Sequence, residues 1–325
     1  QENIWIGQEP NFILLGFFWG SLYFLTQIVQ KIMDAYGLTV KAELAIIKIN
    51  LFGLFLLGGV FILGKFSLVN FFIYHFIIFI LMLYFWWRIL NRNNIPLFPS
   101  EQLSKGLINS YSSEFYQFSM PLFTYGIFSF FLGFADRWLL QMFGGSTEQG
   151  LFSLSFKVGA MCLVFTQPLT PLFHRDIYKA FKNSGLEEMR KLFLRYVPMF
   201  YSIAVCISSF FFFQSDKITV IIGGEHFKGA AVAVALMSLY PIHQTYGQLN
   251  SAVYFATGQT KLYRNLGLVN SIFGLGVIYL FLAPKSQWGL DLGSTGLALK
   301  MVFVQIISQN LMLWFNTKLL KISFI

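Results

Sequence analysis

Leu81–Leu90 reads LMLYFWWRIL, and Leu311–Leu320 reads LMLWFNTKLL. Five positions are identical in the two stretches, and Arg88 corresponds to Lys318. A second match lies upstream in the same order: Gln27, Ala35, Gly37, Thr39, Phe52, Gly53 and Leu54 recur as Gln248, Ala256, Gly258, Thr260, Phe273, Gly274 and Leu275. The matches differ in offset by nine residues (230 against 221), which predicts a longer loop in the second copy around residues 283–293. Two collinear matches predict one structural unit used twice, at residues 27–90 and 248–320.

The composition indicates an integral membrane protein. Hydrophobic residues make up 56% of the chain and charged residues only 11%, whereas a soluble domain carries about 25% charged residues. The net charge of +9 is therefore interpreted as an excess of Lys and Arg in cytoplasmic loops and not as a nucleic-acid footprint. Cys162 and Cys206 lie in apolar runs and are interpreted as small buried hydrophobes. No zinc-ligand spacing or P-loop is present, so no metal or other cofactor is predicted.

Apolar runs long enough to span a bilayer predict an all-α, polytopic helical bundle of about nine transmembrane helices. The predicted spans are 11–29, 44–63, 68–90, 115–142, 151–173, 193–213, 229–256, 266–282 and 296–317. Residues 1–92 then form the last three helices of a first six-helix lobe that is truncated at its N-terminus, because the three spans of 113–213 have no upstream partner. Residues 93–112 are a polar cytoplasmic linker, and 113–325 a complete second six-helix lobe. Both copies run in the same direction, which is a parallel repeat of the kind found in secondary transporters.

The basic residues sort by side of the membrane. Most Lys and Arg of the loops fall on one side, with the densest group in residues 174–191, and the few on the other side are Lys65, Lys217, Lys228 and Lys285. The first side is predicted to be cytoplasmic. Arg88 and Arg92 fall on this side. Lys31, Lys41, Lys261 and the basic residues of 175–191 are interpreted as ordinary anchors there, and Lys48, one turn deeper, as a side chain that reaches back to the interface.

Polar residues within the spans are the candidate site residues. Gly126, Ser129, Gly133 and Asp136 recur at spacings of three and four, so they lie on one helical face that either permits close helix packing or lines a water-filled space. Charges inside a span are costly and are functional candidates. Two interpretations stay open for the charged and polar residues within the spans: a structural contact, or a cavity-lining role in substrate binding. These residues are Asp136 and Arg137, whose structural contact would be a local ion pair, Lys157, Lys300, and His243 and Asn250 on the polar seventh span.

Several short motifs resemble a known family. They are Met120-Pro121, Asp136-Arg137-Trp138, Ser155-Phe156-Lys157, the loop IIGGEHFKGAA at residues 221–231, and Ala256-Thr257-Gly258-Gln259-Thr260-Lys261. In order and spacing the chain resembles the last nine helices of polysaccharide flippases in the multidrug/oligosaccharidyl-lipid/polysaccharide exporter superfamily. The resemblance implies a bacterial inner-membrane protein that moves an undecaprenyl-diphosphate-linked oligosaccharide, such as an O-antigen or lipopolysaccharide precursor, to the outer leaflet by alternating access.

The resemblance also implies the partners: the lipid-linked oligosaccharide, membrane lipids and other polysaccharide-assembly membrane proteins, but no nucleic acid. We expect Arg137, Lys157 and Lys300, which come from three spans at similar depth, to attract the carrier diphosphate. The alternative is a multidrug or small-molecule cation antiporter of the same superfamily, which favours acidic residues in the membrane. A membrane-embedded glycosyltransferase or polymerase is a third reading, but the chain has short outer loops and no Asp-x-Asp motif, so we predict that it is not an enzyme.

Overall fold

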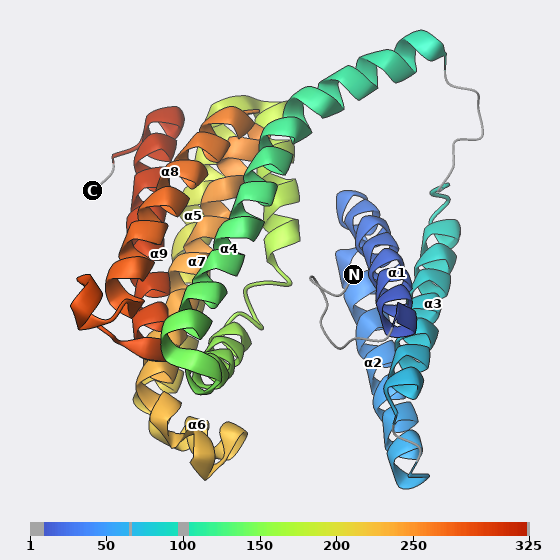
Figure 1. The fold of residues 1–325 in the computed structure, drawn as a ribbon. Helices are drawn as coiled ribbons and strands as arrows, with labels where there is room; N and C mark the ends of the chain where they lie inside the picture. The colour runs from blue at the N-terminus through green and yellow to red at the C-terminus, as the bar shows by residue number, and fades with distance from the viewer. Residues whose placement is uncertain (1–9, 65–66, 97–103, 324–325) are drawn as a thin grey trace. The chain divides into compact units, whose positions relative to one another are not determined.

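The computed structural model describes residues 10–64, 67–96 and 104–323. It divides the chain into two compact units, Gln1–Ser104 and Lys105–Ile325. The described residues are helical and contain no strand, as predicted. Six of the helices are long and apolar enough to cross a membrane. The elements of both units are coloured along the chain in Figure 1.

The first unit contains α1 (Pro10–Ala35), α2 (Thr39–Ile62) and α3 (Leu68–Arg92). Helix α3 packs against both α1 and α2. Its N-terminus is capped by Ser67, whose side chain accepts a hydrogen bond from the Asn70 backbone N–H at 3.2 Å, which satisfies one of the free amides of the first turn. The core of the unit is formed by Met33 of α1, Ala42 of α2, and Trp86 and Leu90 of α3.

The second unit contains α4 (Lys105–Met161), α5 (Thr170–Phe213), the short α6 (Ser215–Gly223), α7 (Ala231–Ala256), α8 (Thr260–Leu282) and α9 (Gly293–Leu320). Helix α7 packs against α4, α5 and α9, so it lies at the centre of this unit. Helix α4 begins at Lys105, inside the segment predicted as a linker. The N-terminus of α9 is held by α4, because Glu148 accepts a hydrogen bond from the Ser294 backbone N–H. A carboxylate is favourable at this end of a helix.

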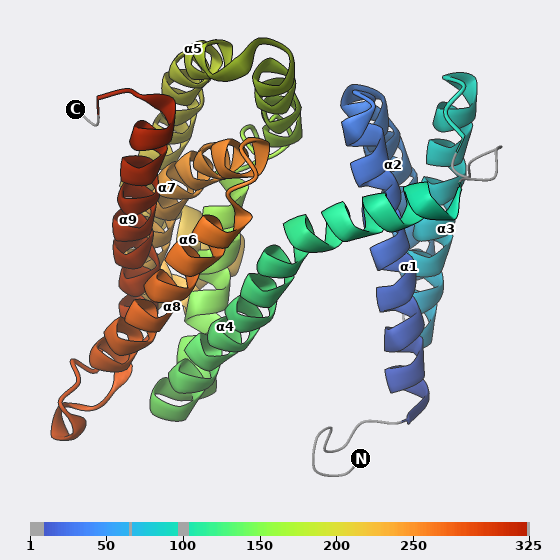
Figure 2. The ribbon, with the colours of Figure 1, turned by 90° about the horizontal axis from the view of Figure 1, so that it is seen from above.

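Helices α4 and α5 each consist of two antiparallel arms. The backbone leaves helical geometry at Gly145 in α4 and at Gly185 in α5, both with positive φ. Arg137 reaches Gln149 and Ser153 across the first turn, and the ring of Phe173 lies against that of Phe200 across the second. Figure 2 shows the reversal of α5. Each turn uses glycine because its backbone conformation is one that side chains with a Cβ rarely adopt.

The two predicted copies of the repeat have the same connection. Helices α1 and α7 end at Ala35 and Ala256, and α2 and α8 begin at Thr39 and Thr260. Between them Gly37 and Gly258 have φ values of 76° and 70°. In each copy the residue after this glycine donates a backbone hydrogen bond to the carbonyl five residues upstream, from Leu38 to Met33 and from Gln259 to Tyr254. This is the pattern of a glycine-terminated helix end.

A close helix approach is also repeated. A Cβ on Gly53 would lie 2.8 Å from the Tyr74 hydroxyl, and a Cβ on Gly274 would lie 3.6 Å from a methyl of Val304. Gly53 corresponds to Gly274 at the offset of 221, and Tyr74 to Val304 at the offset of 230. The longer loop expected in the second copy is present, as Ala283–Leu292 with a short 3-10 helix at Lys285–Gln287. The structure is therefore consistent with the predicted repeat.

The fifth predicted span, 151–173, is not one continuous helix. Helix α4 ends at Met161, residues 162–169 form turns, and α5 begins at Thr170. Pro168 and Pro171 lack the N–H that an unbroken helix would use here. The turn is held to α7 by the side chains of Thr166 and Thr245, whose oxygens are 3.1 Å apart. The segment between the predicted spans 193–213 and 229–256, expected to be a loop, is helical for most of its length, because α6 and a 3-10 helix at Glu225–Ala230 occupy it.

Candidate functional site

The second unit contains a polar pocket of about 300 Å³ between α4, α7, α8 and α9. Helix α4 contributes Tyr125, Ser129, Gly133 and Asp136, which recur at helical spacing on one face. Three of these belong to the stripe predicted from the sequence; Gly126 does not line the pocket, and Tyr125 does. The other helices contribute the polar residues Tyr240 of α7, Asn270 and Ser271 of α8, and Lys300, Gln305 and Ser308 of α9.

The charged centre of the polar pocket is an ion pair between helices that are far apart in sequence. Lys300 Nζ of α9 lies 2.6 Å from Asp136 Oδ2 of α4. Both side chains are nearly buried, with exposed fractions of 11% and 13% respectively. Either charge alone would be expensive to hold in this position. The second carboxylate oxygen of Asp136 and the hydroxyl of Ser129 are buried with no hydrogen-bond partner in the described structure, which is uncommon for buried polar groups.

Uncharged groups form the rest of the polar wall. Asn270 Nδ2 donates to Ser308 Oγ at 2.9 Å. Gln305 Nε2 donates to Gln244 Oε1 at 2.7 Å, and the same oxygen accepts from the Tyr240 hydroxyl at 2.9 Å. These bonds fix the amides and hydroxyls in place. The wall therefore offers neutral donors and acceptors in a preset arrangement, together with the aromatic faces of Tyr125 and Tyr240.

Two glycines of α8 make room for the pocket's larger side chains. A Cβ on Gly267 would lie 2.4 Å from the ring of Tyr125, and a Cβ on Gly274 would lie 3.3 Å from Cε of Lys300. Small residues allow helices to approach closely in membrane proteins. Here they allow Tyr125 and Lys300 to lie against the backbone of α8 while their polar ends reach the pocket.

The structure brings Asp136 and Lys300 together, but places Arg137 and Lys157 elsewhere. The Arg137 guanidinium lies 4.4 Å from the ring centroid of Phe152 and donates to Ser153 Oγ at 3.3 Å. It therefore helps to close the two arms of α4. Lys157 is exposed on the second arm of α4. The sequence left open a local pair between Asp136 and Arg137; the ion pair found for Asp136 is with Lys300.

His243 and Asn250 do not line the polar pocket. His243 borders a separate pocket of about 300 Å³ with Pro198, Tyr201, Tyr246 and Asn310 among its other lining residues. Asn250 is fully buried. It donates to the Gln309 carbonyl at 3.3 Å and its side-chain oxygen accepts from Asn316 at 3.2 Å, so it joins α7 to α9 as a hydrogen-bonded helix contact.

The sequence reasoning missed the contributions of α8 and α9 to the polar pocket. The signal in α8 was present, because Gly267, Asn270, Ser271 and Gly274 recur at spacings of three and four in an apolar helix. Gln305 and Ser308 follow Lys300 on α9 at five and eight residues. Taken together with the stripe on α4, these patterns would have predicted three helices facing one polar space.

Comparison with known proteins extends these observations to a fold class. The chain matches no protein-family model and no curated protein sequence. Solved structures do match: an outward-facing multidrug resistance MATE family transporter of the MOP superfamily (13% identity, 76% of this chain and 56% of that chain, TM-score 0.63) and a MOP superfamily transporter from Pyrococcus furiosus, described as having a binding pocket of reverse polarity (13% identity, 77% and 57%, TM-score 0.61). A MATE structure in the bent conformation is 14% identical, with 76% and 55% covered and a TM-score of 0.62.

At these identities the likeness shows the fold alone. The chain has a MATE-like transporter fold, and with its apolar helices it is a multi-pass membrane protein. It spans a little over half the length of the solved transporters that it matches. Because one fold hosts many functions, the substrate has to be argued from the site.

Proposed function

We propose that the chain acts as a flippase of the bacterial inner membrane that moves a lipid-linked oligosaccharide across the bilayer, by alternating access of its two repeats. The observation that supports this best is the charge state of the polar pocket. Asp136 is the one carboxylate among its lining residues, and Lys300 already neutralises it. We expect a site for organic cations to favour an acid that no basic residue already pairs, because an intramembrane charge is held by a counter-charge.

The chemistry of the remaining wall fits a carbohydrate. Sugars present many hydroxyl groups, which hydrogen-bond to amides and hydroxyls such as those of Asn270, Ser271, Gln305 and Ser308. A pocket with a few placed polar groups and apolar or aromatic walls is typical of small-molecule recognition.

A multidrug cation antiporter is the second candidate. It is favoured by the fold, because the matching structures include a multidrug resistance transporter. In this alternative the Lys300 ammonium would have to release Asp136 before the carboxylate could bind a cation.

Removing two amides of the polar pocket should distinguish these candidates. The double variant Asn270→Leu/Gln305→Leu is expressed in a strain that lacks its own O-antigen flippase. We expect it to lower surface O-antigen about tenfold or more relative to the unmodified chain. Each lost hydrogen bond is worth about 0.5–1.5 kcal/mol, and tenfold corresponds to about 1.4 kcal/mol. Gln141→Leu is the matched control, since Gln141 is an exposed amide of α4 outside the pocket. Unchanged O-antigen with altered ethidium efflux would instead support the antiporter.

A further inference from the structure

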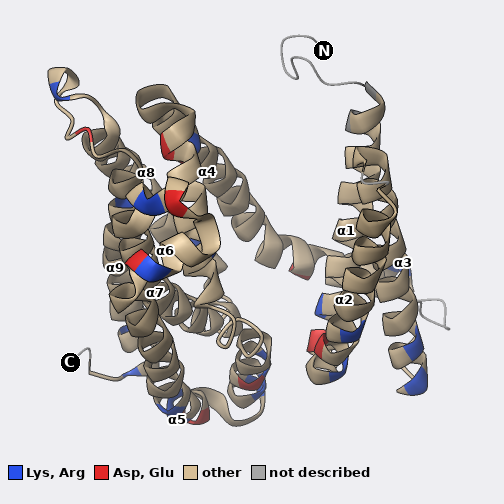
Figure 3. Ribbon diagram, turned by 90° about the horizontal axis from the view of Figure 1, so that it is seen from below, with Lys and Arg blue, Asp and Glu red and all other residues tan. Residues whose placement is uncertain are grey.

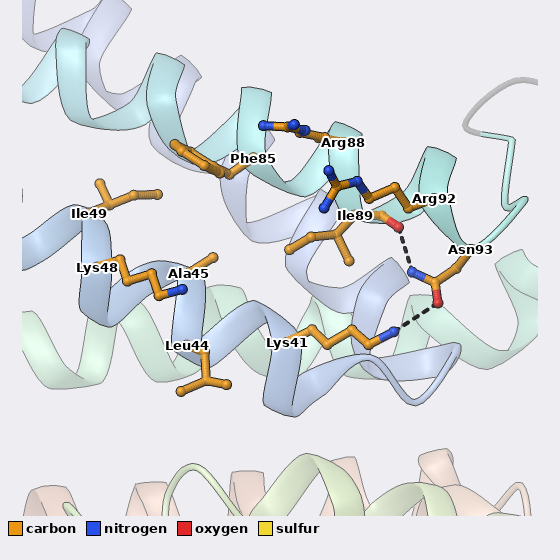
Figure 4. Close-up of a pocket in the computed structure, with 10 residues that line it drawn as sticks. All are labelled: Lys41, Leu44, Ala45, Lys48, Ile49, Phe85, Arg88, Ile89, Arg92 and Asn93. Atoms are coloured by element: carbon orange, nitrogen blue, oxygen red, sulfur yellow. Dashed lines mark hydrogen bonds between the residues drawn. The ribbon is translucent and has the colours of Figure 1, made fainter.

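The first unit contains a second pocket, the basic pocket, between α2 and α3. It has a volume of about 420 Å³ and is drawn in Figure 4. Lys41 and Lys48 border it from α2, and Arg88 and Arg92 border it from α3. The spacings of seven and four residues place each pair on one face of its helix. Figure 3 shows Lys and Arg gathered at one end of α2 and of α3.

The four cations of the basic pocket have no acidic partner. No Asp or Glu is among the ten residues that line it, and none of the four forms an ion pair within the described part of the chain. Lys41 instead donates to Asn93 Oδ1 at 2.9 Å, and Asn93 Nδ2 donates to the Ile89 carbonyl at 2.6 Å. All four side chains are exposed. Like charges that border one pocket repel one another, and an anion between them would relieve the repulsion.

Apart from Asn93, the remaining lining of the basic pocket is apolar. It consists of Leu44, Ala45 and Ile49 of α2 and Phe85 and Ile89 of α3. Lys48 lies nine residues beyond the start of α2, which is about 13 Å along a helix with a rise of 1.5 Å per residue. The pocket therefore combines a cationic lining with apolar surface that runs along spanning helices. This combination fits a ligand with an anionic head and an apolar tail.

The second copy of the repeat provides an internal comparison. The positions equivalent to Lys41 and Lys48 are Leu262 and Val269, and those equivalent to Arg88 and Arg92 are Lys318 and Ile322. Lys318 lies 3.4 Å from the ring centroid of Trp314, so its charge is already engaged. A general preference for basic residues on the cytoplasmic side would act on both copies, since both run in the same direction. At these four equivalent positions the first copy has four cations and the second has one; the other basic residues at this end of the second copy, Lys261, Arg264 and Lys321, lie at different positions, so the grouping on one pair of faces is particular to the first copy.

We propose that the basic pocket binds the phosphate-bearing headgroup of an anionic lipid from the cytoplasmic leaflet. Arg88 and Arg92 can each donate two hydrogen bonds to phosphate oxygens, while Lys41 and Lys48 attract the phosphate as point charges. The lipid tail lies along Ile49 and Phe85. This site stands independently of the glycan proposal, because it requires only a lipid-attached phosphate.

Lipid binding to the purified full-length chain tests the proposal. Native mass spectrometry of the chain in detergent would compare phosphatidylglycerol with phosphatidylcholine. We expect phosphatidylglycerol to bind about tenfold more tightly, and Lys48→Gln/Arg88→Gln to reduce its affinity about tenfold, since hydrogen bonds between charged groups are stronger than neutral ones and tenfold corresponds to about 1.4 kcal/mol. Lys261→Gln/Arg264→Gln is the matched control, because it removes two positive charges near the N-terminus of α8, outside the basic pocket. We expect it to change the affinity for phosphatidylglycerol by less than twofold. Lys48→Arg/Arg88→Lys should keep the preference for the anionic lipid.

Three results would overturn the lipid site. These are equal binding of the two lipids, an equal loss in the control variant, and complete displacement of phosphatidylglycerol by millimolar inorganic phosphate, which would indicate a soluble anion. Thermal unfolding of each variant checks that it is folded. If the double variant melts well below the unmodified chain, Arg92→Gln alone is measured, and an unchanged affinity for phosphatidylglycerol in that variant would count against the proposal.

Discussion

Replacing Asp136 with asparagine should lower the free energy of unfolding of the chain by about 3–5 kcal/mol, because it leaves Lys300 buried with no counter-charge. The Lys300 side chain is 11% exposed, and among the described residues the carboxylate that pairs with its ammonium is that of Asp136, at 2.6 Å. Thermal unfolding in detergent, with denaturant unfolding to convert the shift into free energy, measures the change. Glu114→Gln is the control, since Glu114 is an exposed acid of the same helix, and exposed substitutions usually change stability by less than about 0.5 kcal/mol.

The double variant Asp136→Leu/Lys300→Met separates stability from function. Buried ion pairs can often be replaced by apolar residues at no cost, so this variant should unfold within about 1 kcal/mol of the unmodified chain or above it. It should nevertheless fail to restore surface O-antigen, because the pocket has lost its charged centre. If the Asp136→Asn chain has the same unfolding temperature as the unmodified chain, the ion pair is contradicted. If the double variant still restores surface O-antigen, the polar pocket is not part of the transport mechanism.

The sequence predicted those features of the fold that depend on local chemistry. The apolar runs predicted the helices, because burying a polar segment in a bilayer is costly. The repeat predicted that residues 35–39 and 256–260 have the same structure, and Gly37 and Gly258 explain why: each takes a positive φ at a helix end, which depends on the local sequence and not on any distant contact. The polar face of α4 followed in the same way from spacing alone.

The partners of that face could not be predicted, because they depend on how helices dock. Asp136 and Arg137 are neighbours in sequence, but consecutive residues of a helix point in different directions. Asp136 therefore meets Lys300, 164 positions away, while Arg137 lies over Phe152. The break at residues 162–169 was also missed, because hydropathy reports how apolar a segment is and not whether its backbone is continuous. The prolines indicated a kink, but the pairing of Thr166 with Thr245 could not be seen from the sequence.

The basic pocket shows a different limit. Sorting Lys and Arg by loop treated Lys41, Arg88 and Arg92 as equivalent charges on one side, since that count ignores the face of the helix on which each residue lies. The structure places them with Lys48 around one space. Comparison of the two copies position by position would have shown the asymmetry earlier, because Leu262 and Val269 stand where Lys41 and Lys48 do.

Adding one methyl group at Gly159 should destabilise the chain, whereas the same change at Gly126 should not. Both glycines lie in α4. A Cβ on Gly159 would lie 2.6 Å from the backbone carbonyl oxygen of Met237 on α7, and a backbone atom cannot move aside without shifting its helix. The site is closely packed, between the buried Val158 and the partly buried Leu154 on α4 and the buried Val234 on α7. Overpacking of this kind costs about 1–3 kcal/mol.

Gly126 faces open space, because no neighbouring atom lies within 4 Å of the position that a Cβ would take there. Gly126→Ala should therefore stabilise α4 by up to about 1 kcal/mol through its higher helix propensity. The two substitutions are chemically identical and should shift the unfolding temperature in opposite directions, which helix propensity alone cannot produce. Unfolding of both variants in the same detergent measures this. A Gly159→Ala chain that melts at or above the unmodified chain would mean that α4 and α7 are not in backbone contact there.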